Sequence, residues 1–352
     1  MTPLPLTPPA RPRLGDISFL NCAPLRWALA DGGAREDFGV LSAPPEALAR
    51  ELTRGTLDVS PVSLVQYLRN TDRLMLLPGP VIGSDGPVLS CHLVTRGASP
   101  AELDGATVAL STTSRSTVLL VRMLLEDFVG VRPRYVAHRQ DLDAMLAAAD
   151  AAVLIGDDAL RLTVAKRPGL ALHDAGQLWR RCTGLPMVFA VWAVRRQYAQ
   201  ERQPQVRAVH EALAAAVDRA RLAPLAVAAA AHRESLGSPA GPVPFDVLLR
   251  YYRAIDYTFG KRQLEAIREF SRRAAAHGEV PAGLEPEFAP GLAPGETGTP
   301  PPPRPPATRQ EKENDQAHRT VQIQGRDHVG NARGAGGGAC LPASGSRGSG
   351  TA

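Results

Sequence analysis

Residues 187–194 read MVFAVWAV, an unbroken apolar run whose length and composition are typical of a strand buried on both faces. An earlier run, VLSCHLVT at residues 88–95, also predicts a strand. Strand-like and helix-like segments alternate before and between these runs, which favours an α/β fold with a mostly parallel sheet. Because the two runs bracket a self-contained βαβαβ block, we predict two lobes, two crossings between them, and a ligand cleft where they meet.

The boundaries of the lobes follow from the same pattern. One lobe is predicted to hold residues 13–95 together with 193–280, and the other to hold residues 96–192. The segment 1–12 is rich in proline, and the segment 281–352 contains PPPPRPP, GAGGGA and SGSRGSG. Such compositions bury too little apolar area to offset chain entropy, so we expect a disordered leader at 1–12 and a disordered tail at 281–352.

The charge balance narrows the class of ligand. The 352 residues include 40 Lys and Arg and 35 Asp and Glu, which gives a net charge of +5. The tail holds seven basic and seven acidic residues, so the excess belongs to residues 1–280. Because the arginines are scattered rather than clustered, this mildly positive body fits a small anionic ligand better than a nucleic acid.

No membrane or metal signal is found in the sequence. No apolar stretch approaches the ~18 residues of a membrane span, and the proline-rich start lacks a signal-peptide core, so we expect a cytoplasmic protein. The four cysteines form no CxxC pair and no histidine stands at ligand spacing from them, so no metal site is expected. P-loop, GxGxxG, HExxH and GxSxG motifs are also missing.

Two polar residues stand where predicted strands meet turns or helices. Asn21 follows the strand 14–18 and precedes a helix, so it lies at the carboxyl end of a strand, where open α/β sheets bind ligands. It either binds a ligand there or only caps the helix. Ser90 lies in GPVLS at the start of a crossover strand, and it either faces the cleft or is an ordinary strand residue.

Two predicted helix starts carry hydroxyl groups. The sequence DVSPVS at residues 58–63 predicts a helix beginning at Ser-Pro, and its hydroxyls and free N–H groups form either an anion site or a plain cap. The sequence STTSRST at residues 111–117 crowds six hydroxyls and one guanidinium at one helix start, more than capping requires. This excess suits a carboxylate or phosphate. The candidate binding residues are Ser60, Val62, Ser63, Thr113, Ser114, Arg115, Ser116 and Thr117.

Two further turns are candidates for ligand contact. Gly156, Asp157 and Asp158 follow a buried strand, where the two acids are either functional or a cap and a solvated charge. Thr183, Gly184 and Leu185 form a tight turn into the strand 187–194, where the backbone either touches a ligand or only turns. Composition and spacing alone therefore predict a two-lobed α/β protein that binds a small anion.

Taken together, these segments resemble the chorismate dehydratases of the futalosine route to menaquinone. The resemblance covers about residues 13–275, and the combination of GDDAL with TGLPMVFAVW is its most specific part. The leader and tail lie outside it. The matching words are SFLNCAPL, GTLDVSPVSLVQYLRN, LLPGPVIGSDGPVLS, STTSRSTVLLVRMLL, AAVLIGDDAL, LWRRCTGLPMVFAVW and IDYTFGKRQLEAIREF.

This resemblance implies a fold and a reaction. The fold is that of a type II periplasmic binding protein used as an enzyme, and the reaction is loss of water from chorismate to give 3-[(1-carboxyvinyl)oxy]benzoate, with no cofactor or metal. Asn21 and Ser90 align with the family's active-site Asn and Ser and would bind the reacting ring. The helix start at 113–117 would hold one carboxylate. Since no motif offers a base, the substrate's enolpyruvyl carboxylate is expected to take the ring proton.

Two rival functions remain open at this stage. One is the homologous enzyme of the same pathway that converts cyclic dehypoxanthine futalosine, although the GDDAL and TGLP words favour the dehydratase. The other is a non-catalytic binding protein for a small anion, against which the missing signal peptide argues. The sequence predicts no nucleic-acid or membrane partner and leaves the oligomeric state open.

Overall fold

Two mixed five-stranded sheets form the framework of the computed structural model, which describes residues 11–165 and 167–292. In the first sheet, with the order β2-β1-β3-β10-β4, β1 runs parallel to β2 and β3, whereas β10 runs antiparallel to β3 and β4. The strands are β1 (Arg13–Ile17), β2 (Gly39–Ala43), β3 (Val59–Ser63), β4 (Leu74–Ser84) and β10 (Met187–Arg195).

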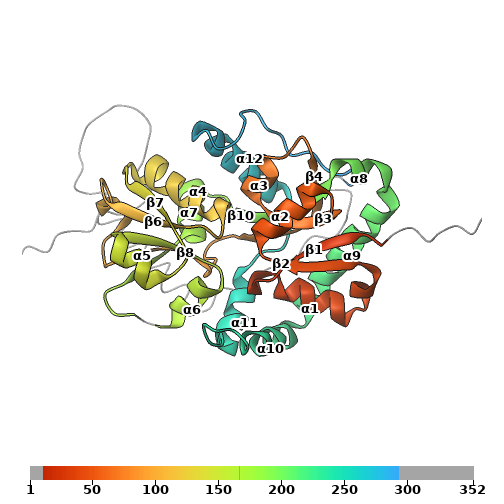
Figure 1. The fold of residues 1–352 in the computed structure, drawn as a ribbon, viewed down its shortest axis with the longest axis horizontal. Helices are drawn as coiled ribbons and strands as arrows, with labels where there is room; N and C mark the ends of the chain where they lie inside the picture. Colours follow the sequence, from red (N-terminus) through yellow and green to blue (C-terminus); the bar gives the residue numbers. More distant parts are fainter. Residues whose placement is uncertain (1–10, 166, 293–352) are drawn as a thin grey trace, which may run out of the picture.

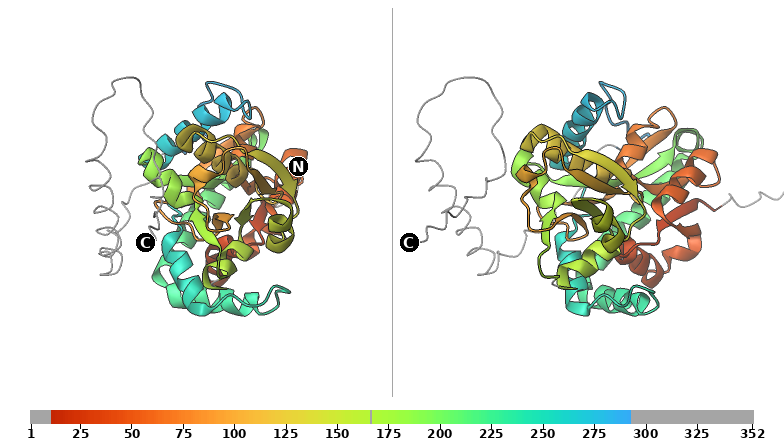
Figure 2. Two further views of the ribbon diagram at one scale, coloured as in Figure 1. Left: turned by 90° about the vertical axis from the view of Figure 1, so that its left-hand side faces the viewer. Right: turned by 60° about the vertical axis from the view of Figure 1, so that its left-hand side comes forward.

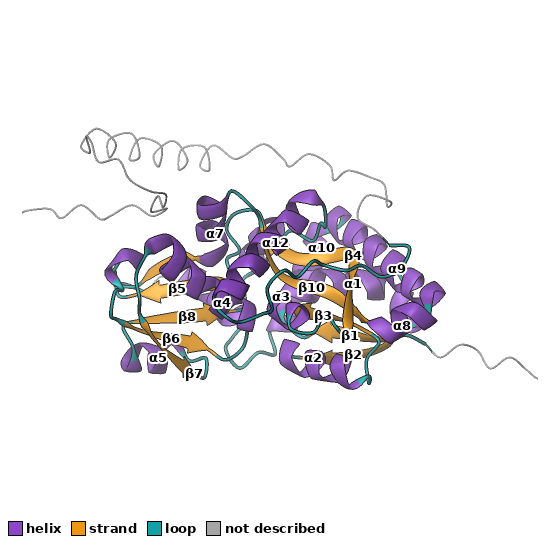
Figure 3. Cartoon of the chain, turned by 90° about the horizontal axis from the view of Figure 1, so that it is seen from above, coloured by secondary structure: helices purple, strands orange, loops and turns teal. Residues whose placement is uncertain are grey.

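The second sheet repeats this arrangement with the order β7-β6-β8-β5-β9. Here β6 runs parallel to β7 and β8, and β5 runs antiparallel to β8 and β9. Figures 1 and 3 show the two sheets as separate lobes side by side. The sequence therefore predicted the two-lobed α/β class correctly. The strands are β5 (Cys91–Thr95), β6 (Thr107–Ser111), β7 (Arg134–His138), β8 (Ala151–Ile155) and β9 (Ala171–Asp174).

The antiparallel strand of each sheet is the one that the chain enters after crossing from the other lobe. The chain leaves β4 at Ser84 and enters β5 at Cys91; it leaves α7 (Ala175–Thr183) and enters β10 at Met187. Both crossings therefore come before the boundaries at residues 95/96 and 192/193 that we set from the sequence. Pairing partners decide which lobe a strand joins, and an apolar run does not reveal them.

Helices cover the faces of both sheets. Figure 2 shows α10 and α11 together at the base of the molecule, and in Figure 1 α11 lies below the junction of the two lobes. The described residues also form short 3-10 turns and one π-helical segment, Leu124–Val129. The α-helices are α1 (Ala23–Asp31), α2 (Pro45–Arg54), α3 (Leu64–Leu68), α4 (Arg115–Met123), α5 (Leu142–Ala148), α6 (Asp157–Ala165), α7, α8 (Arg196–Glu201), α9 (Gln203–Leu222), α10 (Pro224–Ser235), α11 (Phe245–Ala254) and α12 (Lys261–Ala276).

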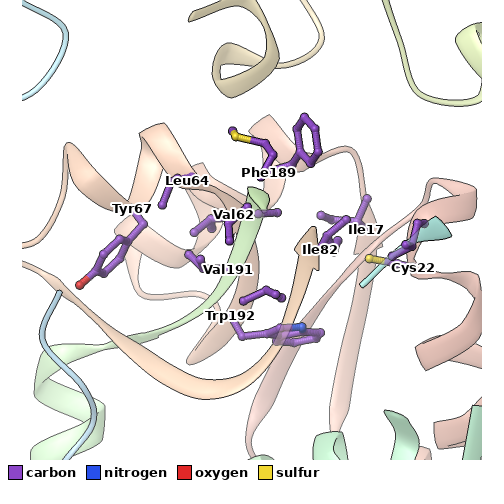
Figure 4. Packing of buried hydrophobic residues seen from close by; sticks show 14 of the residues in the cluster. Ile17, Cys22, Val62, Leu64, Tyr67, Ile82, Phe189, Val191 and Trp192 are labelled. Atoms are coloured by element: carbon purple, nitrogen blue, oxygen red, sulfur yellow. The ribbon is translucent and has the colours of Figure 1, made fainter. Parts of the chain in front are cut away.

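The apolar core follows the alternation of side chains along the strands. One large buried cluster fills the first lobe and continues to α4 and α7 of the second, and Figure 4 shows its packing around Val62, Ile82 and Val191. A smaller cluster that includes Val94 and Met145 lies on the other face of the second sheet. In the described part of the chain, no helix is both long and apolar enough to cross a membrane.

The helix predicted to begin at Ser60-Pro61 is wrong, because residues 59–63 form strand β3. This strand pairs along its length with β10 but meets β1 only at Val59. Proline has no backbone N–H to donate to a neighbouring strand. Pro61 is tolerated in β3 because β3 is not paired with β1 beyond Val59. Burial between two strands overrides the local Ser-Pro signal, and the helix begins only at Leu64.

The tail predicted to be disordered from residue 281 is packed at its start. Ala289 and Leu292 are buried, and the peptide N–H of Ala289 donates to Leu76 O at 2.9 Å. Glu287 accepts two hydrogen bonds from Arg196, each of 2.7 Å. Apolar residues and ion pairs are thus present up to residue 292, before the low-complexity sequence begins. The rest of the predicted tail, 293–352, and the predicted leader up to residue 10 lie outside the described residues.

Candidate active site

A cleft between the two lobes gathers side chains from both sheets. Its apolar lining comes from strand ends and includes Ile17 of β1, Ile82 of β4, Ile155 of β8 and Phe189 of β10. In Figure 4, Ile17, Ile82 and Phe189 lie near one another within the first lobe. The uncharged hydroxyl and amide side chains of the lining are those of Asn21, Ser63, Gln66, Ser90, Thr113, Ser114 and Thr117.

Asn21 contributes an unpaired acceptor to this cleft. It sits in the 3-10 turn Leu20–Cys22 directly after β1, and its Oδ1 is buried with no hydrogen-bond partner in the described part of the chain. The turn itself is firmly held, because Asn21 O accepts a hydrogen bond of 2.7 Å from Tyr257 and Leu20 O accepts one of 3.1 Å from Tyr252. A buried acceptor without a partner is costly, so this geometry suits a ligand that supplies a donor.

Ser90 lies at the end of the first crossing and also lines the cleft. Its Oγ accepts a hydrogen bond of 3.0 Å from the hydroxyl of Tyr251, and its carbonyl oxygen accepts one of 2.7 Å from Gly156 N. The preceding residue, Leu89, has φ = 64°, the one positive φ of a non-glycine residue in the part of the chain that the structure describes. Such a conformation is strained and persists only when its surroundings enforce it.

The carboxylate of Asp174 enforces the conformation of this crossing. It accepts hydrogen bonds from Leu89 N at 2.7 Å and from Val88 N at 3.0 Å, and it also caps α7 through Gln177 N at 3.0 Å. His92 Nε2 lies 2.9 Å from Leu89 O on the other side. These contacts keep residues 88–90 out of the extended conformation of a strand. Strand β5 therefore begins at Cys91 and not at Val88 as predicted.

The hydroxyl-rich start of α4 faces the cleft with four of its five predicted binding residues. Thr113, Ser114, Arg115 and Thr117 line the cleft. Ser114 is the N-cap, and its Oγ accepts from Thr117 N at 3.5 Å. The helix therefore begins at Arg115, within the helix start predicted at 113–117. Ser116 instead points into the protein, where its buried Oγ accepts a hydrogen bond of 3.0 Å from Val65 N and joins α4 to α3.

Arg115 spans the mouth of the cleft. Its Nε lies 3.6 Å from Oε1 of Glu46, which belongs to α2 of the first lobe. Both side chains are about half exposed, at 55% and 41%, so the pair is weak and water reaches it. In the described part of the chain these two are the charged residues that line the cleft. An anionic ligand would therefore compete with Glu46 for Arg115.

The three residues that follow β8, Gly156, Asp157 and Asp158, lie in three different environments. Gly156 lines the cleft. Asp157 reaches across to the first lobe, where its Oδ1 accepts a hydrogen bond of 3.2 Å from Leu20 N, and burial raises the pKa of this carboxyl. Asp158 is exposed and pairs with Arg161 at 3.3 Å. Neither aspartate lines the cleft, and the carboxylate of Asp157 supports the turn that carries Asn21.

Five other predicted binding residues do not line the cleft. Ser60 and Val62 are fully buried in β3, although Ser63 at the end of that strand does line it. Thr183, Gly184 and Leu185 form the turn that ends α7: Thr183 Oγ1 donates to Trp179 O at 2.8 Å and accepts from Leu185 N at 3.1 Å. This turn is explained by helix capping.

Sequence reasoning missed the groups that hold the site together. Tyr251, Tyr252 and Tyr257, all from a single segment, donate to Ser90 and to the turn that carries Asn21, and Asp174 fixes the crossing. One signal was available: three of the six tyrosines of the chain fall within residues 251–257.

The chemistry available in the cleft is limited. Cys91 lines it, but burial raises the pKa of its thiol to about 12, so the group remains protonated near neutral pH. In the described ranges no group of three or more His, Cys, Asp or Glu side chains is placed to hold a metal ion. What the cleft offers is hydroxyl and amide hydrogen bonding, helix-start N–H groups, one guanidinium and an apolar wall.

Comparison with known proteins places this chain in a family. The family model described as menaquinone biosynthesis matches residues 12–276. A chorismate dehydratase of Thermus thermophilus is 37% identical over 198 residues, which are 52% of this chain and 70% of that protein.

Solved structures agree on the fold. A protein of Archaeoglobus fulgidus, 18% identical, matches with a TM-score of 0.61 over 76% of this chain and 98% of its own. The periplasmic aliphatic sulphonate binding protein of Escherichia coli, 16% identical, matches with a TM-score of 0.57 over 85% of this chain and 98% of its own. The two lobes thus have the fold of periplasmic binding proteins, and the family match over residues 12–276 shows that this chain belongs to the menaquinone biosynthesis family.

Proposed function

We propose that this protein is a chorismate dehydratase, a carbon–oxygen lyase that removes water from chorismate to give 3-[(1-carboxyvinyl)oxy]benzoate. The observation that carries the proposal is the 37% identity to a chorismate dehydratase over 70% of that protein's length. The substrate is a small molecule, and the proposal needs no metal or cofactor. The cytoplasmic location expected from the sequence stays a prediction.

The cleft supports this substrate by its shape and by its chemistry. A cyclohexadiene ring is flat and apolar, and the isoleucine and phenylalanine side chains at the strand ends provide an apolar wall. The two carboxylates of chorismate need donors. The start of α4 supplies them through its free N–H groups, Ser114, Thr117 and the guanidinium of Arg115.

The proposed reaction is an elimination in which positioning does most of the work. The ring carbon next to the enol ether loses its proton to the enolpyruvyl carboxylate of the same molecule, and the neighbouring carbon loses its hydroxyl. The proton then completes the departing water, and the ring becomes aromatic. Asn21 would orient the carboxylate with its amide, and Ser90 would hydrogen-bond the leaving hydroxyl. The amide Nδ2 of Asn21 would donate to that carboxylate, and its buried Oδ1, which makes no hydrogen bond in the described part of the chain, would accept one from a hydroxyl of the substrate.

The test is incubation of the purified protein with chorismate, followed by absorbance and mass spectrometry. We expect loss of the diene absorbance, an aromatic product lighter by one water, and the same rate in EDTA. Turnover of cyclic dehypoxanthine futalosine instead would identify the homologous enzyme of the pathway. Tight chorismate binding without any product would point to a binding protein. Activity that vanishes in EDTA and returns with a divalent ion would contradict the cofactor-free reaction.

A further inference from the structure

Three phenols from one segment converge on Ser90 and on the turn that carries Asn21, the two residues that would act on the substrate. Tyr251 and Tyr252 lie on α11, and Tyr257 lies in the loop that follows it. Tyr252 and Tyr257 donate to carbonyl oxygens of the turn that carries Asn21, so they hold backbone. Tyr251 differs from them, because it donates to a side chain, the Oγ of Ser90, at 3.0 Å.

Tyr251 is built as a permanent donor. Its side chain is 1% exposed and does not line the cleft. Burial raises the pKa of its phenol well above the usual value, so the hydroxyl keeps its proton throughout the physiological range. Since this proton is given to Ser90, the hydroxyl proton of Ser90 must point away from Tyr251.

The backbone of Ser90 is already fixed by other contacts. Gly156 N donates to its carbonyl oxygen at 2.7 Å, and Asp174 holds the residue before it in a strained conformation. The freedom that remains to Ser90 is the rotation of its side chain and of its hydroxyl proton. Tyr251 is placed to restrict both of these rotations.

We propose that Tyr251 is a positioning residue for Ser90, whose hydroxyl it orients so that the serine proton is donated into the cleft, to the hydroxyl oxygen that leaves chorismate. The inference rests on the proposed function and names the group that orients one of its catalytic residues. No covalent step involves Tyr251, which keeps its proton and acts through a hydrogen bond.

The first test is Tyr251→Phe, which removes one oxygen atom and keeps the buried ring. We expect kcat for chorismate to fall by about tenfold, equivalent to ~1.4 kcal/mol, with KM changed by less than about twofold. The matched control is Tyr198→Phe. The hydroxyl of Tyr198 is buried without a hydrogen-bond partner in the described part of the chain, and its ring packs against Arg195, far from Ser90 in the sequence and on a different element. This control should keep the wild-type kcat.

A double-mutant cycle separates positioning from a merely structural role. In the Ser90→Ala background, adding Tyr251→Phe should leave kcat unchanged, because the group that Tyr251 orients has gone. An equal loss in both backgrounds would show that Tyr251 acts on the fold and would overturn the inference. If Ser90→Ala turns over too slowly for steady-state measurement, single-turnover formation of the aromatic product at high enzyme concentration is the readout for the same cycle, with the same two outcomes.

A measurement on the wild-type protein keeps the inference testable if Tyr251→Phe does not fold. Neutron diffraction from deuterated crystals should place the Tyr251 deuterium between the two oxygens and the Ser90 deuterium toward the cleft. A Ser90 deuterium pointing at Tyr251 would refute the proposal. The proposed function and the role of Tyr251 are contradicted by different results. A wild-type protein that does not convert chorismate contradicts the proposed function. An active wild type with an equally active Tyr251→Phe variant contradicts only the role of Tyr251.

Discussion

Replacement of Asp174 by alanine should remove activity far more than it removes stability. The carboxylate of Asp174 binds Val88 N and Leu89 N in the crossing and Gln177 N at the start of α7. Loss of the helix cap costs about 1 kcal/mol. Each hydrogen bond to a charged acceptor is worth ~1.5–3 kcal/mol, so a crossing that kept its shape would lose a further ~3–6 kcal/mol.

The crossing can avoid most of this loss if the backbone of residues 88–89 moves to an unstrained conformation. Leu89 at φ = 64° stores strain of ~1–3 kcal/mol, and the freed N–H groups can reach water once the loop moves. Strain release and hydration together offset most of the lost bonds, so we expect the free energy of unfolding to fall by only about 1–3 kcal/mol. Relaxation, however, displaces Ser90, and a shift of ~1 Å in a catalytic group costs about a hundredfold in rate.

The assay is kcat/KM for chorismate together with urea unfolding. We expect a loss of about a hundredfold for Asp174→Ala and a smaller one for Asp174→Asn, whose amide keeps one acceptor oxygen. The control is Asp104→Ala, because Asp104 also accepts a backbone N–H, that of Arg132 at 2.9 Å, but does so in the loop before β6, at the end away from the cleft. If Asp174→Ala and Asp104→Ala lose similar stability and both stay active, the reasoning is refuted.

Three further changes test other parts of the site and fold. Glu46→Gln should lower KM for chorismate by up to about fivefold at low salt, because the arginine it pairs with is released and an exposed pair is worth at most ~1 kcal/mol; an unchanged KM would show that the arginine does not meet the substrate. Asn21→Ala should reduce kcat by at least about a hundredfold with little change in melting temperature, since its Oδ1 makes no hydrogen bond within the described residues, and a wild-type kcat would exclude its catalytic role. Truncation after His277 should destabilise the protein by about 3 kcal/mol or more, because it removes buried Val280 and Leu292, whereas truncation after Leu292 should not; equal melting temperatures for the two truncations would contradict this.

Local sequence signals predicted the residues that stand at strand ends and helix starts. Asn21 after β1, Ser90 before β5, and Thr113 and Ser114 before α4 line the cleft, because the end of a strand or helix is encoded by neighbouring residues. The same signals failed at Ser60-Pro61. There the sequence is typical of a helix start, but pairing of β3 with β10 through residues 190–194 buries it as a strand.

Contacts between distant segments could not be predicted. Tyr251 lies 161 residues from Ser90, and Asp157 lies 137 residues from Leu20. No periodicity links such pairs, and one sequence contains no record of which positions vary together. Asp174 shows the same limit: its carboxylate caps α7 through Gln177 and also holds Val88 and Leu89, which lie 86 and 85 residues away in the sequence.

The lining of the cleft bears on where the proton goes in the proposed reaction. Within the described residues, its titratable side chains are Glu46, Cys91 and Arg115. The thiol of Cys91 stays protonated because burial raises its pKa to about 12, and Glu46 is paired with Arg115 at the exposed mouth. The carboxylate of the substrate itself is therefore the acceptor that the site leaves available.

This arrangement has a physical advantage over a base fixed in the protein. A buried carboxylate beside a dianionic substrate would suffer both desolvation and repulsion, and each of these raises its pKa and resists binding. A substrate carboxylate brings its charge only when it is bound, and the α4 start and Arg115 are present to stabilise it. Neutral donors that fix geometry, such as Ser90 and Asn21, are then sufficient, so a fold shared with binding proteins can become catalytic through positioning alone. By the same argument, a chorismate ester blocked at the enolpyruvyl carboxylate should bind in the cleft but lose no water.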